Sequence, residues 1–138
     1  MSEGSKHPDW HRSAIHECQQ LFACAMHCGD HGDADGFASC FADEGVFLRG
    51  ESAIVGHDAL RAYIAARPPG ARVRHIASPP HVLVVNEASA RSRTVCVVYR
   101  QESAAEAIVS VLADILDEYQ YLAQGWRITR RTASLSFG

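Results

Sequence analysis

The sequence predicts an α+β fold, in which about three helices in the N-terminal half pack on a curved, mainly antiparallel sheet. Apolar residues recur at helical spacing in three segments before residue 68, which indicates amphipathic helices. After residue 71 the chain consists mostly of strand-like segments separated by turn signals. A sheet that wraps around helices leaves a mostly apolar pocket, so function would rest on the few polar side chains that project into it.

The three predicted helices occupy the first half of the chain. Pro8 and Asp9 suit the first turn of a helix that ends near Gly29, where the segment Gly-Asp-His-Gly supplies a corner. A short second helix fits residues 34–42. A third fits residues 57–67, because the Pro-Pro-Gly sequence that follows stops it.

The predicted strands follow these helices, apart from a small hairpin formed by residues 46–48 and 53–55. Residues 104–123 have the Ala, Leu and Glu content of a helix. Side chains in this segment nevertheless alternate from Val109 to Ile115, and two tyrosines follow, so we predict a strand. The long strands are predicted at residues 72–77, 81–86, 90–101, within 107–122, and at 126–137.

Length and composition fit one ordinary globular domain. The chain has 138 residues, of which 47% are hydrophobic and 21% charged, so we expect a single domain over 1–138 with residues 1–7 frayed. A formal charge of −3 disfavours a nucleic-acid or anionic-membrane surface. Because the sequence has neither an apolar run of membrane-spanning length nor the apolar core of a signal peptide, a cytoplasmic location is expected.

Five cysteines occur without the spacing of a disulfide framework. Their odd count predicts buried, reduced thiols and no disulfides. Cys24 and Cys28 have His27 and His31 nearby, but this spacing matches no familiar closed zinc site, so no metal is expected. Glycine-rich phosphate loops and a Gly-x-Ser-x-Gly elbow do not occur, which disfavours nucleotide chemistry and acyl transfer.

Asp30 and His75 are two candidates for chemistry. Asp30 lies at the corner after the first helix, where it is either a capping carboxylate or a side chain tucked against the sheet. Strand alternation places His75 on the same face as Val73. A buried imidazole beside a carboxylate is a competent general base, whereas one bonded only to backbone is a core histidine.

Arg131 is the third candidate. It alternates with Arg130, so one of the two faces inward, and position alone does not say which. An inward guanidinium group could hold a carboxylate, a phenolate or a departing anion. The alternative is a salt bridge to Asp114, Asp117 or Glu118.

Several loose motifs follow one another along the chain: Gly29–Asp35, Cys40–Phe47, Gly56–Tyr63, Arg74–His75, Asp117–Tyr119 and Gly125–Arg131. In this order and spacing they resemble the SnoaL-like branch of the NTF2-like superfamily, which includes scytalone dehydratase, lindane dehydrochlorinase and bile-acid dehydratases. The resemblance covers roughly residues 12–135 and implies a cone-shaped fold that encloses a pocket.

The resemblance implies a cofactor-independent lyase or isomerase. In the eliminating members an aspartate pairs with a histidine that removes a proton, and those positions match Asp30 and His75. An arginine that assists the leaving group looks like Arg131. The expected substrate is a small apolar or cyclic molecule, and the expected assembly is a homo-oligomer, either a trimer or a dimer. We expect the substrate pocket to be lined by Phe47, Tyr63, Val97, Tyr99, Ala113 and Ile115.

The chain also departs from these enzymes. Ala25 stands where the dehydrochlorinase has a lysine and the bile-acid enzyme a tyrosine, and Gly29 replaces a tyrosine of scytalone dehydratase. The strand that carries a second histidine in scytalone dehydratase has none here. The alternative function is therefore a non-catalytic ligand-binding or assembly module, including a role like that of an oxygenase small subunit.

Overall fold

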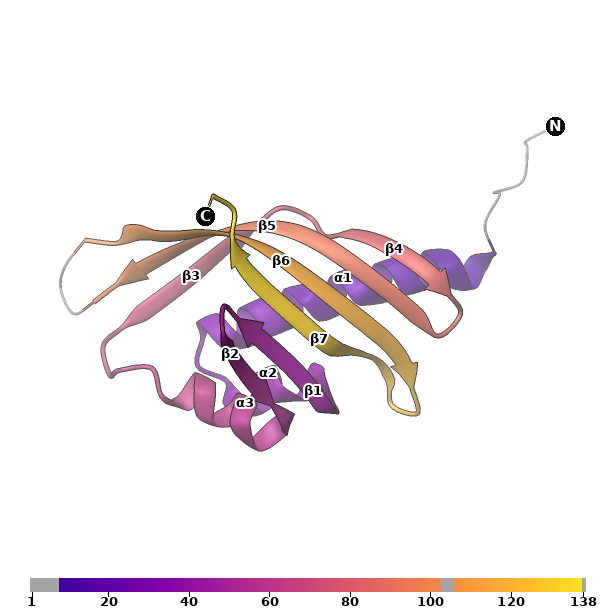
Figure 1. Cartoon of the computed structure of the whole chain (residues 1–138), viewed down its shortest axis with the longest axis horizontal. Coiled ribbons are helices and arrows are strands. Elements are labelled where there is room, and N and C mark those ends of the chain that lie inside the picture. The colour runs from indigo at the N-terminus through magenta and orange to yellow at the C-terminus, as the bar shows by residue number, and fades with distance from the viewer. Residues whose placement is uncertain (1–7, 103–105, 138) are drawn as a thin grey trace.

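A computed structural model of the chain describes residues 8–102 and 106–137, and the predicted fraying of residues 1–7 lies outside this range. The described part contains three helices and one seven-stranded sheet, as the α+β prediction requires (Figure 1). The elements are α1 (Asp9–Asp30), α2 (Ala34–Ser39), β1 (Phe41–Arg49), β2 (Ser52–Val55), α3 (Gly56–Ala65), β3 (Arg72–Ala77), β4 (His81–Asn86), β5 (Ser89–Gln101), β6 (Ile108–Leu122) and β7 (Gly125–Leu135).

The sheet has the strand order β2-β1-β7-β6-β5-β3, and β4 pairs with the first half of β5. Every pairing is antiparallel except that of β1 with β7, which is parallel. The mainly antiparallel prediction is therefore confirmed. Long strands β5 and β6 form the middle of the sheet and curve over α1 (Figure 1).

Helix α1 lies against one face of this sheet and contacts β3, β4 and β7. Its buried residues Ala14, Cys18, Phe22 and Ala25 recur every three or four positions, so they form one apolar stripe. Ala14, Cys18 and Ala25 pack into a core that also includes Leu60 of α3. Phe22 packs in a second cluster with Cys96 and Ile115. No helix in the described ranges is long and apolar enough to cross a membrane.

The corner after α1 is set by two local features. Gly32 has a φ of +72°, in the left-handed region that glycine adopts without strain. Asp33 then caps α2, because its side chain accepts a hydrogen bond of 2.9 Å from the backbone N–H of Gly36. The chain thus reverses immediately after Asp30 and leaves that residue at the end of α1, facing β3.

The boundary between α2 and β1 differs from the prediction. The helix ends at Ser39 rather than near residue 42, and β1 begins at Phe41 rather than at residue 46. Parallel pairing with β7 overrides the helical spacing, since the Ile128 N–H donates to the Cys40 carbonyl at 2.9 Å and Phe41 lies opposite Ile128. The register of this pairing shifts between Phe41 and Val46, and regular parallel pairing continues from Val46 opposite Arg130.

Strand β6 occupies most of the segment whose composition also suited a helix. It pairs with β5 on one side and β7 on the other. Buried residues at 113, 115, 117 and 119 alternate with exposed residues at 116, 118 and 120, as in a strand with one covered face. Pairing with a strand on each side therefore makes this segment a strand, as predicted.

Candidate active site

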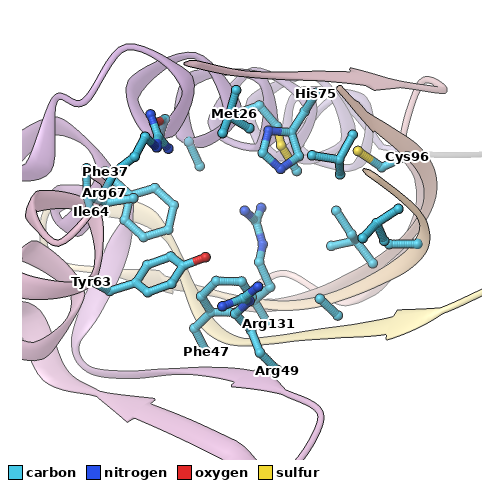
Figure 2. A pocket seen from close by; sticks show the side chains of 18 of the residues that line it. Met26, Phe37, Phe47, Arg49, Tyr63, Ile64, Arg67, His75, Cys96 and Arg131 are labelled. Carbon is cyan, nitrogen blue, oxygen red and sulfur yellow. The ribbon is translucent and has the colours of Figure 1, made fainter. Parts of the chain in front are cut away.

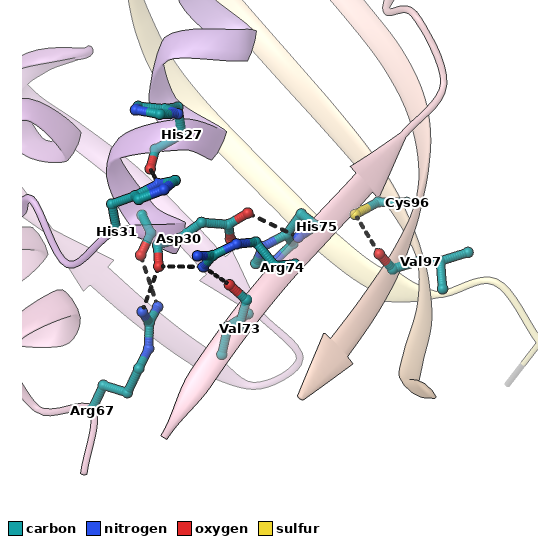
Figure 3. A network of polar contacts seen from close by, with 10 residues as sticks. His27, Asp30, His31, Arg67, Val73, Arg74, His75, Cys96 and Val97 are labelled. Atoms are coloured by element: carbon teal, nitrogen blue, oxygen red, sulfur yellow. Dashed lines mark hydrogen bonds and ion pairs between the residues drawn. The ribbon is translucent and has the colours of Figure 1, made fainter. Parts of the chain in front are cut away.

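The structure brings Asp30 and His75 together. Asp30 is the last residue of α1, and His75 lies on β3 with 25% of its side chain exposed. The Asp30 carboxylate receives two hydrogen bonds from this one residue. His75 Nδ1 donates to Oδ1 at 2.5 Å, and the His75 backbone N–H donates to Oδ2 at 2.9 Å (Figure 3).

These contacts fix both the charge of Asp30 and the tautomer of His75. Burial favours the neutral carboxyl group, but the hydrogen bonds from the His75 side chain and backbone, together with the attraction of His75 and Arg74, hold the pKa of Asp30 below its ordinary value. An ionised carboxylate only accepts hydrogen bonds, so Nδ1 of the neutral imidazole carries the proton. Its Nε2 then has the free lone pair that a general base needs.

Two arginines hold the end of α1 that carries Asp30. Arg67 donates to the carbonyls of Gly29 at 2.8 Å and Asp30 at 3.2 Å. Arg74 donates to the same Asp30 carbonyl at 3.2 Å (Figure 3). The last carbonyls of a helix lack intrahelical partners and carry partial negative charge, so guanidinium groups stabilise this end and fix the position of Asp30.

His75 faces a cavity of about 380 Å³ between the helices and the sheet (Figure 2). This volume is within the range of about 300–1,000 Å³ that is typical of small-molecule sites. Most of the wall is apolar, and the polar side chains that line it include Arg49, Tyr63 and Arg131. The apolar and thiol side chains at the cavity surface are Ala25, Met26, Phe37, Phe47, Ile64, Ala66, Pro68, Val73, Cys96, Val98, Val111, Ala113, Ile115 and Ala133.

Four of the six residues expected at the pocket wall are placed there: Phe47, Tyr63, Ala113 and Ile115. Val97 and Tyr99 are not among the residues that line the cavity. Side chains alternate along β5, and the neighbouring Cys96, Val98 and Arg100 line it instead. On β5 the residues that line this cavity are thus displaced by one position from the expected ones.

Arg131, rather than Arg130, faces inward, and it forms a salt bridge with Asp117. Its Nε and Nη2 donate to the two carboxylate oxygens at 2.8 and 2.7 Å, and the side chains are only 3% and 0% exposed. Burial disfavours the cation, but the charge and hydrogen bonds of Asp117 raise the pKa of Arg131 above its ordinary value. Tyr119 adds a third contact by donating to Asp117 at 3.3 Å.

The salt bridge leaves the Nη1 nitrogen of Arg131 without a hydrogen bond to Asp117. Nη1 makes no hydrogen bond to any described residue, while the guanidinium carbon lies 5.2 Å from the centre of the Phe22 ring. Figure 2 shows the guanidinium group directed into the cavity on the side of His75. Arg131 therefore stabilises the fold through Asp117, while its Nη1 faces the cavity.

The cysteines do not form a second reactive centre. All five are free, and four are buried, whereas Cys24 is exposed against expectation. Burial raises the pKa of Cys18 to about 12 and that of Cys96 to about 11, so both remain protonated thiols at neutral pH. Within residues 8–102 and 106–137, no group of three or more His, Cys, Asp or Glu residues is arranged to hold a metal ion.

Sequence reasoning missed Arg49, Arg67, Arg74 and Arg100 as residues of this site. The available signal was weak: Arg67 follows α3 directly before a Pro-Pro-Gly stop, and Arg74 precedes His75. Strand alternation placed Arg74 on the face opposite His75. It reaches Asp30 because the end of α1 lies beside the edge strand β3 (Figure 3).

Comparison with known proteins identifies the family and the fold of the chain. The family model described as the SnoaL-like domain matches residues 10–132. Curated proteins gave no significant match. Among solved structures, the chain is similar to a variant of Rv3472, a Mycobacterium tuberculosis protein of unknown function, with 27% identity over 96% of this chain and 78% of that chain and a TM-score of 0.86.

Two Novosphingobium aromaticivorans structures share the fold. An NTF2-like protein with a cystatin-like fold is 23% identical over 89% of this chain and 82% of that chain, with a TM-score of 0.79. A putative scytalone dehydratase is 14% identical over 93% of this chain and 87% of that chain, with a TM-score of 0.80. The resemblance to the NTF2-like fold is confirmed.

The Arg131–Asp117 pair generates a stability prediction. Asp117→Asn should lower the free energy of unfolding by about 3–5 kcal/mol, because it leaves a buried cation with a neutral partner. Urea denaturation at neutral pH measures the change. Glu118→Gln is the matched control, since this neighbour is exposed and should shift stability by less than about 0.5 kcal/mol. Equal stability of Asp117→Asn and the wild type would contradict the assigned role.

The lowered pKa of Asp30 predicts a pH-dependent effect of Asp30→Asn. The ionised carboxylate stabilises the fold above the unfolded-state pKa of about 3.9, and this contribution is lost as the pH falls through the lower folded-state pKa. The difference in unfolding free energy between wild type and Asp30→Asn should therefore be largest near neutral pH and shrink in acid.

Urea denaturation between pH 7 and pH 3 tests this expectation. The same substitution in a His75→Ala background is the control, because the side-chain hydrogen bond that lowers the pKa is then missing and the pH dependence should weaken. A difference that stays constant over this pH range argues against an ionised Asp30 carboxylate that stabilises the fold.

Proposed function

The chain belongs to the SnoaL-like family, and we propose that it is a cofactor-independent lyase or isomerase of the dehydratase type. The observation that carries the proposal is the hydrogen bond from His75 Nδ1 to the Asp30 carboxylate, which leaves Nε2 of a cavity-lining imidazole as the base. The substrate class is a small apolar or cyclic molecule, in keeping with the size and apolar wall of the cavity.

His75 Nε2 takes a proton from a carbon atom next to an electron-withdrawing group. The electron pair of the broken C–H bond moves into a new C=C bond, and in a lyase the leaving group departs with the electron pair of its own bond. In an isomerase the imidazolium instead returns the proton to another carbon. Asp30 stabilises the imidazolium that forms and holds its ring in place.

Arg131 and Tyr63 are proposed to stabilise the negative charge that develops. Arg131 Nη1 is available because Asp117 occupies only Nε and Nη2. Figure 2 shows the Tyr63 hydroxyl directed into the same cavity, and it makes no hydrogen bond to any described residue. Donors fixed in an apolar cavity stabilise a developing anion more than solvent-exposed donors do.

The second candidate is a ligand-binding or assembly module without turnover. It is favoured by the cavity wall at α1, where Ala25 is fully buried at the position of a polar assistant in the related enzymes. An oxygenase small-subunit role belongs to this class. Purification of the chain alone distinguishes that version, because a subunit that depends on a large partner would be insoluble by itself.

We also propose that the protein forms a homo-oligomer, a trimer or a dimer, through the outer face of the sheet. Ile76, Leu83, Val95 and Leu116 are between 44% and 63% exposed. Register places them on one face, since Ile76 pairs with Val97, Leu83 with Arg91 and Leu116 with Arg93 along β5. Exposed apolar side chains gathered on one face are typical of association surfaces.

The catalytic proposal predicts the effect of replacing His75. A panel of cyclic ketones with acidic α-hydrogens, some with a β-hydroxyl group, is followed by NMR in D₂O for α-deuteration and water loss. His75→Gln should slow any turnover by about 10²–10⁴-fold, because the general base is lost. Asp30→Asn should also slow it, because the carboxylate that stabilises the imidazolium is gone.

His81→Gln is the matched control, because His81 is an exposed residue of β4 outside the cavity and should leave the rate unchanged. Rates that survive in folded His75→Gln protein would rule out the base assignment. Binding of panel members without deuteration or water loss would favour the ligand-binding module.

A further inference from the structure

The charged side chains that line the cavity are all basic. Among the described lining residues are Arg49, Arg67, Arg100 and Arg131, together with His75, and no Asp or Glu. Asp30 borders a separate, shallower groove on the other side of His75. The cavity is therefore electropositive, although the chain as a whole has a formal charge of −3. A cleft lined by one sign of charge attracts ligands of the opposite sign.

Two of these arginines are already occupied by the protein. Arg131 is neutralised by the buried Asp117. Arg67 donates two hydrogen bonds to the carbonyls at the end of α1. Arg67 keeps its charge, but its donors are directed to backbone carbonyls, so the guanidinium groups left to bind a ligand directly are those of Arg49 and Arg100.

Arg49 and Arg100 lie where the cavity opens. On β1 the wall passes from Phe47, which is 8% exposed, to the exposed Arg49 on the same face of the strand. On β5 it passes from the fully buried Cys96 to Arg100, whose side chain is 42% exposed. The residues deep in the cavity are thus apolar. Its opening, here called the mouth, carries the cationic side chains of Arg49 and Arg100.

Arg49 is held in place without an anionic partner. Its guanidinium carbon lies 5.1 Å from the centre of the Tyr63 ring, and this ring packs edge-on against Phe47 with centroids 5.6 Å apart. No described carboxylate forms an ion pair with Arg49. Arg100 has only a long 3.5 Å contact to the exposed Glu102, and such exposed pairs contribute little.

We propose that the molecule bound in this cavity carries a carboxylate group that pairs with Arg49 at the mouth, while its uncharged ring system fills the apolar interior toward His75. A planar guanidinium group matches a carboxylate with two parallel hydrogen bonds. Arg100 also lines the cavity and adds positive potential there. This inference adds a ligand class to the proposed function. It rests on that function only for the statement that the ring end of the ligand, near His75, is the end that reacts.

Isothermal titration calorimetry with 2-naphthoate and the neutral 2-naphthamide tests the proposal, because the two probes share size and shape and differ in charge. The wild type should bind naphthoate at least about tenfold more tightly than the amide. Arg49→Gln should remove most of this preference and leave amide affinity unchanged. Arg91→Gln, which removes the same charge from an exposed residue outside the cavity, should bind like the wild type.

Three results would overturn the proposal. The first is equal affinity of the wild type for both probes, including no binding of naphthoate at millimolar concentration. The second is an equal loss of naphthoate affinity in Arg49→Gln and Arg91→Gln, which would indicate a general effect of net charge. The third is a preference that survives in Arg49→Gln, and its loss in His75→Gln would then place the anion beside His75.

The binding result is separate from the catalytic one. Naphthoate preference in His75→Gln protein is expected to persist, since the mouth does not depend on the base. Failure of the proposed reaction appears as turnover that does not need His75, whereas failure of this inference appears as affinity that does not need Arg49.

Discussion

The hydrogen bond between Asp30 and His75 is the interaction on which the rest of this site depends. It joins the C-terminal end of α1 to the edge strand β3, and it fixes which ring nitrogen is free. Arg67 and Arg74 hold the same helix end by its carbonyls, so the carboxylate is positioned by backbone contacts as well as by its own hydrogen bonds. The imidazole ring is oriented because α1 ends at Asp30, beside β3.

The arginines that line the cavity differ in their partners. Arg131 is paired within the protein, whereas Arg49 has no anionic partner among the described residues. Asp117 neutralises Arg131 in the core, where an unpaired guanidinium would destabilise the fold. Arg49 at the mouth lacks such a partner among the described residues and is held over Tyr63. A ligand with an apolar body and one anionic end would complement this arrangement, since the deep wall offers few charged groups and the mouth offers a cation.

Periodicity predicted most of the fold, because each helix buries one stripe and each strand one face. It failed at positions where pairing with a strand distant in the sequence determines the structure. Strand β1 begins at Phe41 because β7 lies beside it and contributes Ile128, a residue near the other end of the chain. Because valines lie on both faces of β5, the sequence pattern did not indicate that Val98, rather than Val97, faces the cavity. Arg131 could be distinguished from Arg130 only through its cross-strand partner Asp117.

The tautomer of His75 tests the central claim most directly. Nitrogen-15 NMR of the labelled histidine rings at neutral pH, with the His75 signals assigned by their loss in His75→Gln, reports which ring nitrogen carries the proton. The account predicts a protonated Nδ1 and an unprotonated Nε2 in the wild type, with the preference weakened in Asp30→Asn. A protonated Nε2 in the wild type, or identical His75 signals in both proteins, would contradict it.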